Sequence, residues 1–377
     1  MQFRDLQKQY QVLKEDMDKA ILDAVASGAY IMGKPVIELE SQLAEYVGVK
    51  HCLTCANGTD ALTLALKAWG VGPGDAVFVP DFTFFSSAEV VPLEGATPVF
   101  VDVCEDTFNL DAEDLERAVK EVLAEGRLKP RVVVAVDLFG LPADYSAIRK
   151  VSDKYGLLIL EDGAQGFGGS IDGKRACSFG DIATTSFFPA KPVGCYGDGG
   201  AVFTDNDDLA ALIESYRVHG KGAFKYDNVR IGMNSRLDTV QAAVLQVKLK
   251  AFADYELDAV NAAAARYTEL LQGVATPVIP EGFRSSWAQY TIRLRDNGQR
   301  DALQASLKEQ GIPSMVYYPK PMHLQTAFAQ MSFRAEPRNL CPVASSLCER
   351  VLSLPMHPYI TEEDIETVCN AVLTALK

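Results

Sequence analysis

The chain has 377 residues, a net charge of −14, and 48% hydrophobic against 23% charged residues. This length exceeds what a single core usually fills, which predicts two domains, and the acidic balance argues against a general nucleic-acid or anionic-membrane surface. No apolar stretch is long enough for a transmembrane helix and the polar start lacks the apolar core of a signal peptide, so we expect a cytoplasmic protein without a membrane partner.

The first half of the chain alternates strands and helices. Helices are predicted over 12–26 and 36–46, on either side of a glycine-bounded break at 28–33. Strands are then predicted at 51–56, 76–80, 98–103, 131–137 and 157–161, with helices between them at 59–69, 86–93, 111–125 and 144–155. The run 131–137 is almost continuously apolar, as in a parallel sheet covered on both faces. The pattern predicts a large doubly wound α/β domain.

After residue 200 the rhythm changes. A strand at 201–204 and a helix at 207–216 precede a polar loop over 220–234. A long alanine-rich helical stretch, 237–271, is expected to break near Tyr255. The remainder predicts a strand at 288–295, a helix at 300–310, a strand at 313–318 and a closing helix at 362–376. We therefore expect a large domain over 1–250 and a smaller C-terminal α+β domain over 251–377.

Cysteine and histidine usage gives no metal or redox signal. Of eight scattered cysteines only Cys52 and Cys55 form a CxxC pair, without a second pair, and the four histidines are dispersed. A zinc or redox site would need more ligands at suitable spacing. Reduced, buried thiols and no metal are therefore expected.

An acid and a lysine suggest the chemistry. Asp162 ends an apolar run and is followed closely by Gln165, while Lys191 stands 29 residues after Asp162 in a loop of small residues. A lysine that forms a Schiff base and an acid that pairs with a pyridinium nitrogen are what pyridoxal phosphate (PLP) requires. Gln165 could donate to the ring's phenolic oxygen, and burial beside a cationic ring would lower the pKa of Lys191. The structural alternative is that Asp162 is a strand-end acid that caps a turn.

Three further groups could serve such a cofactor, each with an ordinary structural alternative. Gly58 and Thr59 open a helix whose N-terminus could take a phosphate, or could simply be capped. Phe84 follows a strand end where a ring could stack on a flat heterocycle, or pack in the core. Asn234 and Arg236 stand at a helix entrance and suit a phosphate or a carboxylate, but N-terminal capping explains Asn234 as well.

Together these blocks resemble the DegT/DnrJ/StrS family of nucleotide-sugar aminotransferases, a branch of the fold type I PLP enzymes. The matching segments are 28–33, 57–62, 83–84, 161–165, 186–200, 234–238 and 317–325. The resemblance implies a PLP-dependent sugar transaminase with a large doubly wound mixed sheet domain, in which glutamate donates the amino group to a keto-sugar linked to a nucleoside diphosphate.

The resemblance also implies residue roles. Lys191 would be the Schiff-base lysine, Asp162 the partner of the ring nitrogen, Gln165 the contact of the ring hydroxyl and Phe84 the stacking ring. The remaining positions would be Gly58, Thr59 and Ser186 for the phosphate, Asn234 for the phosphate of the other subunit of a homodimer, and Arg236, Tyr317 and Tyr318 for the sugar.

Two departures from the family pattern stand out. This chain has Gly163 where the family usually has Ala, and Tyr317 where it often has His. The second change concerns sugar specificity.

Within the family, this chain is most similar to the subfamily that acts on UDP-2-acetamido-2-deoxy-3-oxo-glucuronate, in amino-sugar synthesis for surface polysaccharide. The alternatives are a C4 aminotransferase for a 4-keto-6-deoxy sugar, a PLP-binding regulator without turnover, and another fold type I enzyme such as an aldolase or desulfurase.

Overall fold

The computed structural model describes residues 1–224, 226–331 and 341–377. Its centre is a seven-stranded sheet with the order β1-β9-β8-β5-β4-β2-β3. The strands are β1 (His51–Cys55), β2 (Asp75–Pro80), β3 (Thr97–Val101), β4 (Lys129–Val136), β5 (Leu158–Asp162), β8 (Ile182–Ser186) and β9 (Gly200–Thr204). The run from β8 to β3 is parallel, and β9 is antiparallel to both β8 and β1. The sheet is therefore mixed, as predicted.

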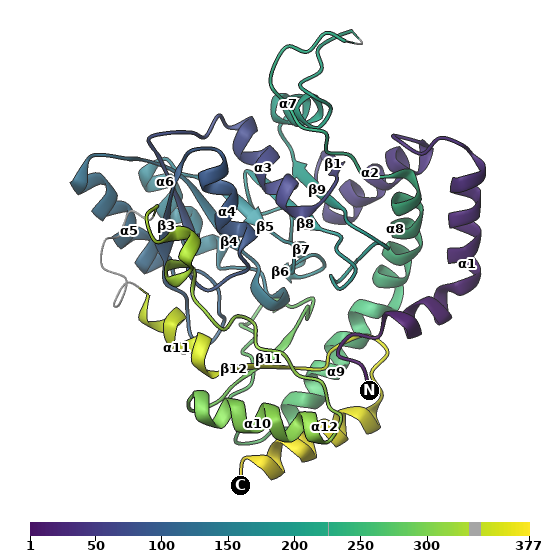
Figure 1. Cartoon of the computed structure of the whole chain (residues 1–377), viewed down its shortest axis with the longest axis vertical. Helices are drawn as coiled ribbons and strands as arrows, with labels where there is room; N and C mark the ends of the chain where they lie inside the picture. Colours follow the sequence, from purple (N-terminus) through teal and green to yellow (C-terminus); the bar gives the residue numbers. More distant parts are fainter. Residues whose placement is uncertain (225, 332–340) are drawn as a thin grey trace.

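Helices cover both faces of this sheet because its central strands are apolar on both sides (Figure 1). On β2, Val77 and Val79 join one buried cluster while Phe78, between them, joins another. This alternation follows from the period of two in a strand. The helices that accompany the sheet are α3 (Gly58–Ala68), α4 (Ser86–Leu93), α5 (Ala112–Glu125), α6 (Tyr145–Tyr155) and α7 (Asp207–Arg217). The doubly wound prediction is confirmed.

Two N-terminal helices pack against one long helix beside the sheet. These are α1 (Leu6–Ala26) and α2 (Lys34–Val47), and both lie on α8 (Thr239–Ala251). A π-helical turn, η2 (Phe252–Glu256), joins α8 to α9 (Leu257–Leu270). The irregularity predicted near Tyr255 is therefore present, although the chain stays helical through it.

A smaller antiparallel unit follows. It pairs β11 (Tyr290–Arg293) with β12 (Val351–Leu354), next to α10 (Asn297–Glu309), α11 (Pro342–Arg350) and α12 (Glu362–Ala375). Short strands β6 (Ser170–Ile171), β7 (Lys174–Arg175) and β10 (Phe283–Arg284) form a third sheet, and single 3-10 turns are η1 (Leu138–Gly140), η3 (Met322–Leu324) and η4 (Thr326–Phe328). The division of the chain at residue 250 stays a prediction. None of the helices in the described ranges combines the length and apolar character needed to cross a membrane.

The strand predicted at 313–318 was wrong. That segment makes one isolated bridge, between Met315 and Ser353, and β11 pairs instead with β12, which the sequence did not indicate. Pro313 begins the segment and Pro319 follows it, and neither can donate to a strand ladder. The segment instead carries its tyrosines to the edge of the large sheet.

Candidate active site

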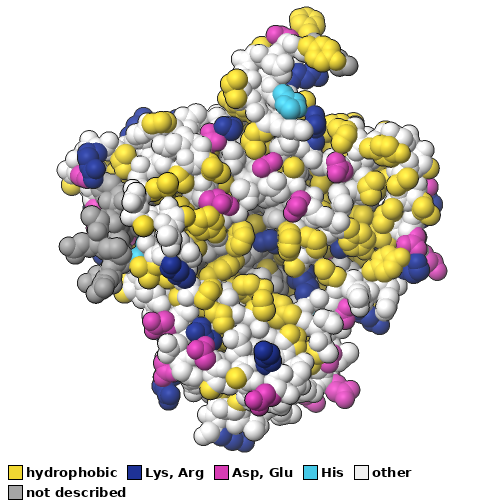
Figure 2. Space-filling view, in the orientation of Figure 1, with side chains coloured by type: hydrophobic (Ala, Val, Ile, Leu, Met, Phe, Trp, Pro, Cys, Tyr) yellow, Lys and Arg dark blue, Asp and Glu magenta, His cyan; other side chains and the backbone are white. Residues whose placement is uncertain are grey.

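A cavity of about 370 Å³ lies at the edge of the sheet where β2, β5 and β8 end. Parallel strands bring their carboxyl ends to one edge, which is where α/β sheets usually hold ligands. Of the residues predicted from the sequence, those that line the cavity are Gly58, Thr59, Phe84, Asp162, Gln165, Ser186, Lys191, Tyr317 and Tyr318. In Figure 2 the molecule is hollowed between the large sheet and the smaller β11–β12 unit, with hydrophobic side chains around the hollow.

Lys191 and Asp162 share this cavity and act on each other electrostatically. Burial lowers the pKa of the Lys191 amine, Asp162 opposes that shift, and the cation of Arg4 adds to it. Burial likewise raises the pKa of Asp162, against the hydrogen bond from Ser87 and the attraction of Lys191. Burial thus shifts the amine of Lys191 toward its neutral form, which is the nucleophilic one.

Two donors fix the Asp162 carboxylate. Ser87 Oγ donates to Oδ2 at 2.7 Å, and the backbone N–H of Ala164 donates to Oδ1 at 3.2 Å. Ser87 lies in the first turn of α4 and is buried. Sequence reasoning missed it, although its position three residues after Phe84, at a strand-to-helix turn, was the available signal.

The preceding acid, Glu161, serves a different purpose. Its carboxylate accepts backbone N–H groups from Phe179 at 2.6 Å and Gly180 at 2.9 Å, and a third from Cys177. Asp137 is also buried here, and accepts from Tyr145 Oη at 2.8 Å. Burial and the charge of Glu161 raise the pKa of Asp137 well above its usual range. Burial also raises the pKa of Glu161, to about 7, while the three backbone N–H groups oppose that shift. Glu161 therefore ties down the 177–180 loop.

The start of α3 forms a cradle for an anion. Asn57 caps the helix by accepting the N–H of Asp60 at 2.8 Å, which leaves the first N–H groups aimed outward. A Cβ atom on Gly58 would lie 2.7 Å from Ser186 Cβ, so this approach requires glycine. Thr59 Oγ1 and Ser86 Oγ lie 2.9 Å apart at the same place. Hydroxyls and N–H groups at a helix N-terminus suit a phosphate.

Gln165 connects the large sheet to residues 313–318, which we call the tyrosine segment. Its Oε1 accepts the N–H of Phe139 at 2.8 Å, and its Nε2 donates to Tyr318 Oη at 3.0 Å. Tyr318 lies with its ring centre 6.1 Å from that of Phe84, whose side chain is 51% exposed. One face of the cavity is therefore aromatic, and Phe84 is accessible to a ring stacked on it.

A buried contact between a histidine and an acid places the tyrosine segment. His323 Nδ1 lies 2.5 Å from Asp81 Oδ2, and the His323 N–H donates to Oδ1 at 2.8 Å. The N–H of Met322 donates to the Asp81 carbonyl at 2.8 Å. These bonds dock residues 322–323 against the end of β2 and so hold Tyr317 and Tyr318 over the cavity. The two residues are 242 positions apart in the chain, so no local sequence pattern predicts this contact.

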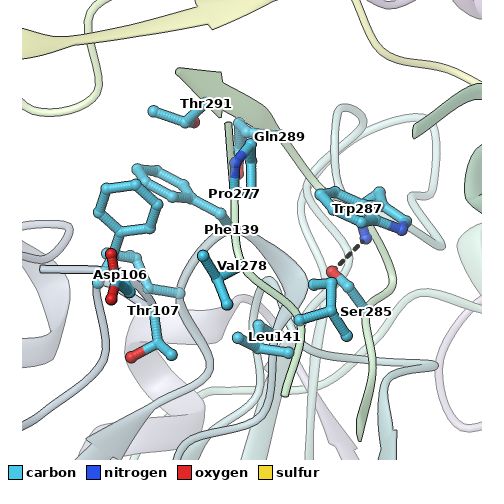
Figure 3. Close-up of a pocket in the computed structure, with 13 residues that line it drawn as sticks. Asp106, Thr107, Phe139, Leu141, Pro277, Val278, Ser285, Trp287, Gln289 and Thr291 are labelled. Carbon is cyan, nitrogen blue, oxygen red and sulfur yellow. Dashed lines mark hydrogen bonds between the residues drawn. The ribbon is translucent and has the colours of Figure 1, made fainter. Parts of the chain in front are cut away.

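Figure 3 shows a second, water-sized cavity of about 20 Å³. Gln289 lines both cavities, and its N–H donates to the Phe139 carbonyl at 3.3 Å. Its amide oxygen is buried and meets no hydrogen-bond partner among the described residues. A volume of this size holds one water molecule, which would satisfy that oxygen.

Asn234 and Arg236 do not line the Lys191 cavity in the single chain. Arg236 donates to Asn234 Oδ1 and, with Lys221 and Arg230, lines a separate open cavity on the projecting loop after α7. This loop exposes 90% of Ile231. Figure 2 shows hydrophobic side chains at its tip, well away from the central hollow.

Comparison with known proteins decides the class. Residues 11–373 match the model of the DegT/DnrJ/EryC1/StrS aminotransferase family. The chain belongs to this family. It is 44% identical over 374 residues to a UDP-2-acetamido-2-deoxy-3-oxo-D-glucuronate aminotransferase of Pseudomonas aeruginosa, with 99% of each chain covered. It is 41% identical to a pleiotropic regulatory protein of Geobacillus stearothermophilus, over 98% of this chain and 96% of that one. It is 39% identical to a UDP-N-acetyl-3-dehydro-alpha-D-glucosamine 3-aminotransferase of Acidithiobacillus ferrooxidans, over 99% and 97% of the two chains.

Solved structures of the DegT/DnrJ/EryC1/StrS family agree. A family aminotransferase from Brucella abortus superposes with a TM-score of 0.96 and 50% identity, and 99% of each chain is covered. The PLP form of a sugar aminotransferase from Streptococcus pneumoniae superposes with a TM-score of 0.87 and 27% identity, over 96% and 97% of the chains. The fold is therefore fold type I, and the protein is a PLP-dependent sugar aminotransferase, as the sequence predicted. The amine, the carboxylate and the phosphate cradle fit that cofactor.

Proposed function

We propose that this enzyme transfers an amino group from glutamate to carbon 3 of UDP-2-acetamido-2-deoxy-3-oxo-glucuronate, in the cytoplasm, for surface-polysaccharide synthesis. The observation that carries the chemistry is that Lys191 and Asp162 line one cavity beside the Gly58 phosphate cradle. The choice of sugar is supported by the similarity to the Pseudomonas enzyme over nearly the whole of both chains.

The cofactor supplies an aldehyde that bonds to an amine and a ring that takes up electrons. Lys191 would hold it covalently and then, when freed, move a proton at the reacting carbon. Asp162 would keep the ring nitrogen protonated, and Gln165 would donate to the ring hydroxyl. Phe84 would stack on the ring, while Gly58, Thr59 and Ser186 would bind the phosphate.

A homodimer completes the site in this proposal. Asn234 would reach the phosphate of the other subunit's cofactor, and Arg236 would pair with the acidic sugar's carboxylate. Their position outside the Lys191 cavity of their own chain supports this arrangement. The exposed apolar tip of the same loop suits burial against a second copy. Tyr317 and Tyr318 would contact the sugar.

Hybrid dimers test the shared site. Lys191→Ala and Asn234→Ala chains are mixed after dissociation and reassociation. If Asn234 acts in the other subunit's site, the mixture regains about a quarter of parent turnover, because half of the dimers are hybrids with one intact site. If Asn234 acts in its own chain's site, mixing restores nothing, and the shared site is refuted.

The substrate is tested by offering the UDP-3-keto-glucuronate derivative and a 4-keto-6-deoxy nucleotide sugar, each with glutamate, and locating the new amine by mass spectrometry and NMR. Amination at carbon 3 of the acidic sugar is expected. Preference for the 4-keto sugar would favour the C4 alternative. The similarity to a regulatory protein supports the alternative of a PLP-binding regulator. If this protein binds PLP but converts no glutamate, the assay favours that alternative.

A further inference from the structure

The segment before α1 joins the smaller unit to the Lys191 loop. The carbonyl of Phe3 accepts the N–H of Met356 at 3.1 Å, just after β12. The Phe3 ring meets Tyr317 edge-on, with centroids 6.2 Å apart. Arg4, the next residue, donates from Nη2 to the Lys191 carbonyl at 2.8 Å and to the Pro192 carbonyl at 3.4 Å. In Figure 1 the N-terminus accordingly lies beside the smaller unit, below the large sheet.

Arg4 completes the anchoring of the Lys191 backbone. The N–H of Lys191 donates to the Phe188 carbonyl at 2.8 Å, and its own carbonyl accepts from Arg4. A Cβ atom on Gly194 would lie 2.5 Å from the Pro189 carbonyl oxygen, so the turn behind the lysine is tightly closed. Both polar backbone groups of Lys191 are hydrogen-bonded, so the backbone position from which its side chain enters the cavity is fixed.

The guanidinium also acts through its charge. Burial lowers the pKa of Arg4 to about 10, against the attraction of Glu256, so the group remains a cation at neutral pH. Glu256 is engaged by Gln9 and Tyr359, and Lys248 shares the cluster with a pKa lowered to about 8. Arg4 therefore stands as a fixed positive charge behind Lys191.

We propose that Arg4 is a positioning residue for Lys191, which holds the lysine's backbone carbonyl and places a fixed positive charge beside the lysine. The inference rests on the role proposed above for Lys191. The charged and titratable groups around that lysine are Asp162 from β5, Asp198 from the turn before β9, Tyr317 and Tyr318 from the tyrosine segment, and Arg4. Asp162 opposes the loss of the proton and Arg4 favours it.

The test follows covalent attachment of PLP to the apoprotein across pH, by near-visible absorbance and borohydride fixation. Arg4→Met removes the charge and both hydrogen bonds. Attachment near pH 7 should slow several-fold, and the rate profile should move to higher pH, because more of the lysine is protonated. Arg4→Lys keeps the charge and should retain the parent profile. Arg295→Met, at an exposed position in the smaller unit, is the matched control.

A folded Arg4→Met protein with the parent profile would overturn the proposal. If Arg4→Met does not fold, Arg4→Gln and Arg4→Lys are compared instead. A pH profile of attachment that moves to higher pH in Arg4→Gln and not in Arg4→Lys supports the proposal. The same profile in both variants overturns it. Lys191→Ala separates this from the function itself, because attachment that persists without Lys191 would refute the role of the lysine whatever Arg4 does.

Discussion

Ser87 donates a hydrogen bond from its Oγ to Asp162 Oδ2 at 2.7 Å, and both side chains are buried. Ser87→Ala removes a bond that holds down the pKa of Asp162, which burial already raises. The Asp162 pKa should therefore rise further, and the acid limb of kcat/KM should move to higher pH. We expect roughly tenfold lower kcat/KM on that limb, since a hydrogen bond to a charged group contributes about 1.5–3 kcal/mol.

The pH profile of kcat/KM, measured beside that of Ser178→Ala, checks this. Ser178 bonds a backbone carbonyl in the loop after β7, outside the cavity. Identical acid limbs in parent and Ser87→Ala would mean that Ser87 does not tune Asp162.

Lys191→Ala should abolish both covalent attachment of PLP and transamination. No other lysine lines the cavity among the described residues, so no second amine is in place to replace it. Absorbance, borohydride fixation and peptide mass mapping measure the attachment, with Lys308→Ala, on the exposed side of α10, as the control. Retained turnover would refute the assigned role.

Gly58→Ala should weaken PLP binding by roughly tenfold or more. The added Cβ would lie 2.7 Å from Ser186 Cβ, and overpacking of this kind costs about 1–3 kcal/mol. Gly72→Ala is the matched control, because its Cβ would meet only a carbonyl oxygen at 3.8 Å. The dissociation constant of PLP, from fluorescence titration of the apoproteins, should change in the first variant and not in the second.

Gly163 and Cys177 should be energetically coupled. A Cβ at position 163 would lie 2.6 Å from Cys177 Sγ, which gives a physical reason for glycine where the family usually has alanine. Gly163→Ala should lower the free energy of unfolding by about 1–3 kcal/mol, and adding Cys177→Ala should restore most of it. Additive effects of the two changes in urea unfolding would contradict this contact.

Asp137→Asn should flatten the pH dependence of stability. The folded protein raises the pKa of Asp137 well above its usual range, so above about pH 4 the folded state holds a proton that the unfolded chain has released. The free energy of unfolding then falls as pH rises, by about 1.4 kcal/mol per unit at most, until the folded pKa is passed. The uncharged asparagine has no such proton, so urea unfolding between pH 5 and 8 should show a shallower slope.

The sequence predicted the core of the sheet and singled out Asp162 and Lys191, which the structure places in one cavity. Short apolar runs rich in valine, such as 131–137, favour buried strands, and Asp162 and Lys191 stand at a spacing that suits PLP chemistry. Strand β8 was missed because its threonines make it look polar. Their hydroxyls are satisfied inside: Thr184 donates to the Glu161 carbonyl at 3.2 Å and Thr185 to that of Gly163 at 3.0 Å. Contacts such as Asp81 with His323 join distant parts of the chain, and no local pattern reports them.

The adjacent acids Glu161 and Asp162 have different roles because neighbouring residues on a strand point to opposite sides of the sheet. Glu161 binds the backbone N–H groups of the 177–180 loop, and Asp162 faces the cavity. A slip of β5 by a single residue between β4 and β8 would exchange them, presenting the longer acid to the cofactor and leaving the loop unclamped. Insertions or deletions within this strand should therefore be far more damaging than substitutions of its aliphatic residues by one another.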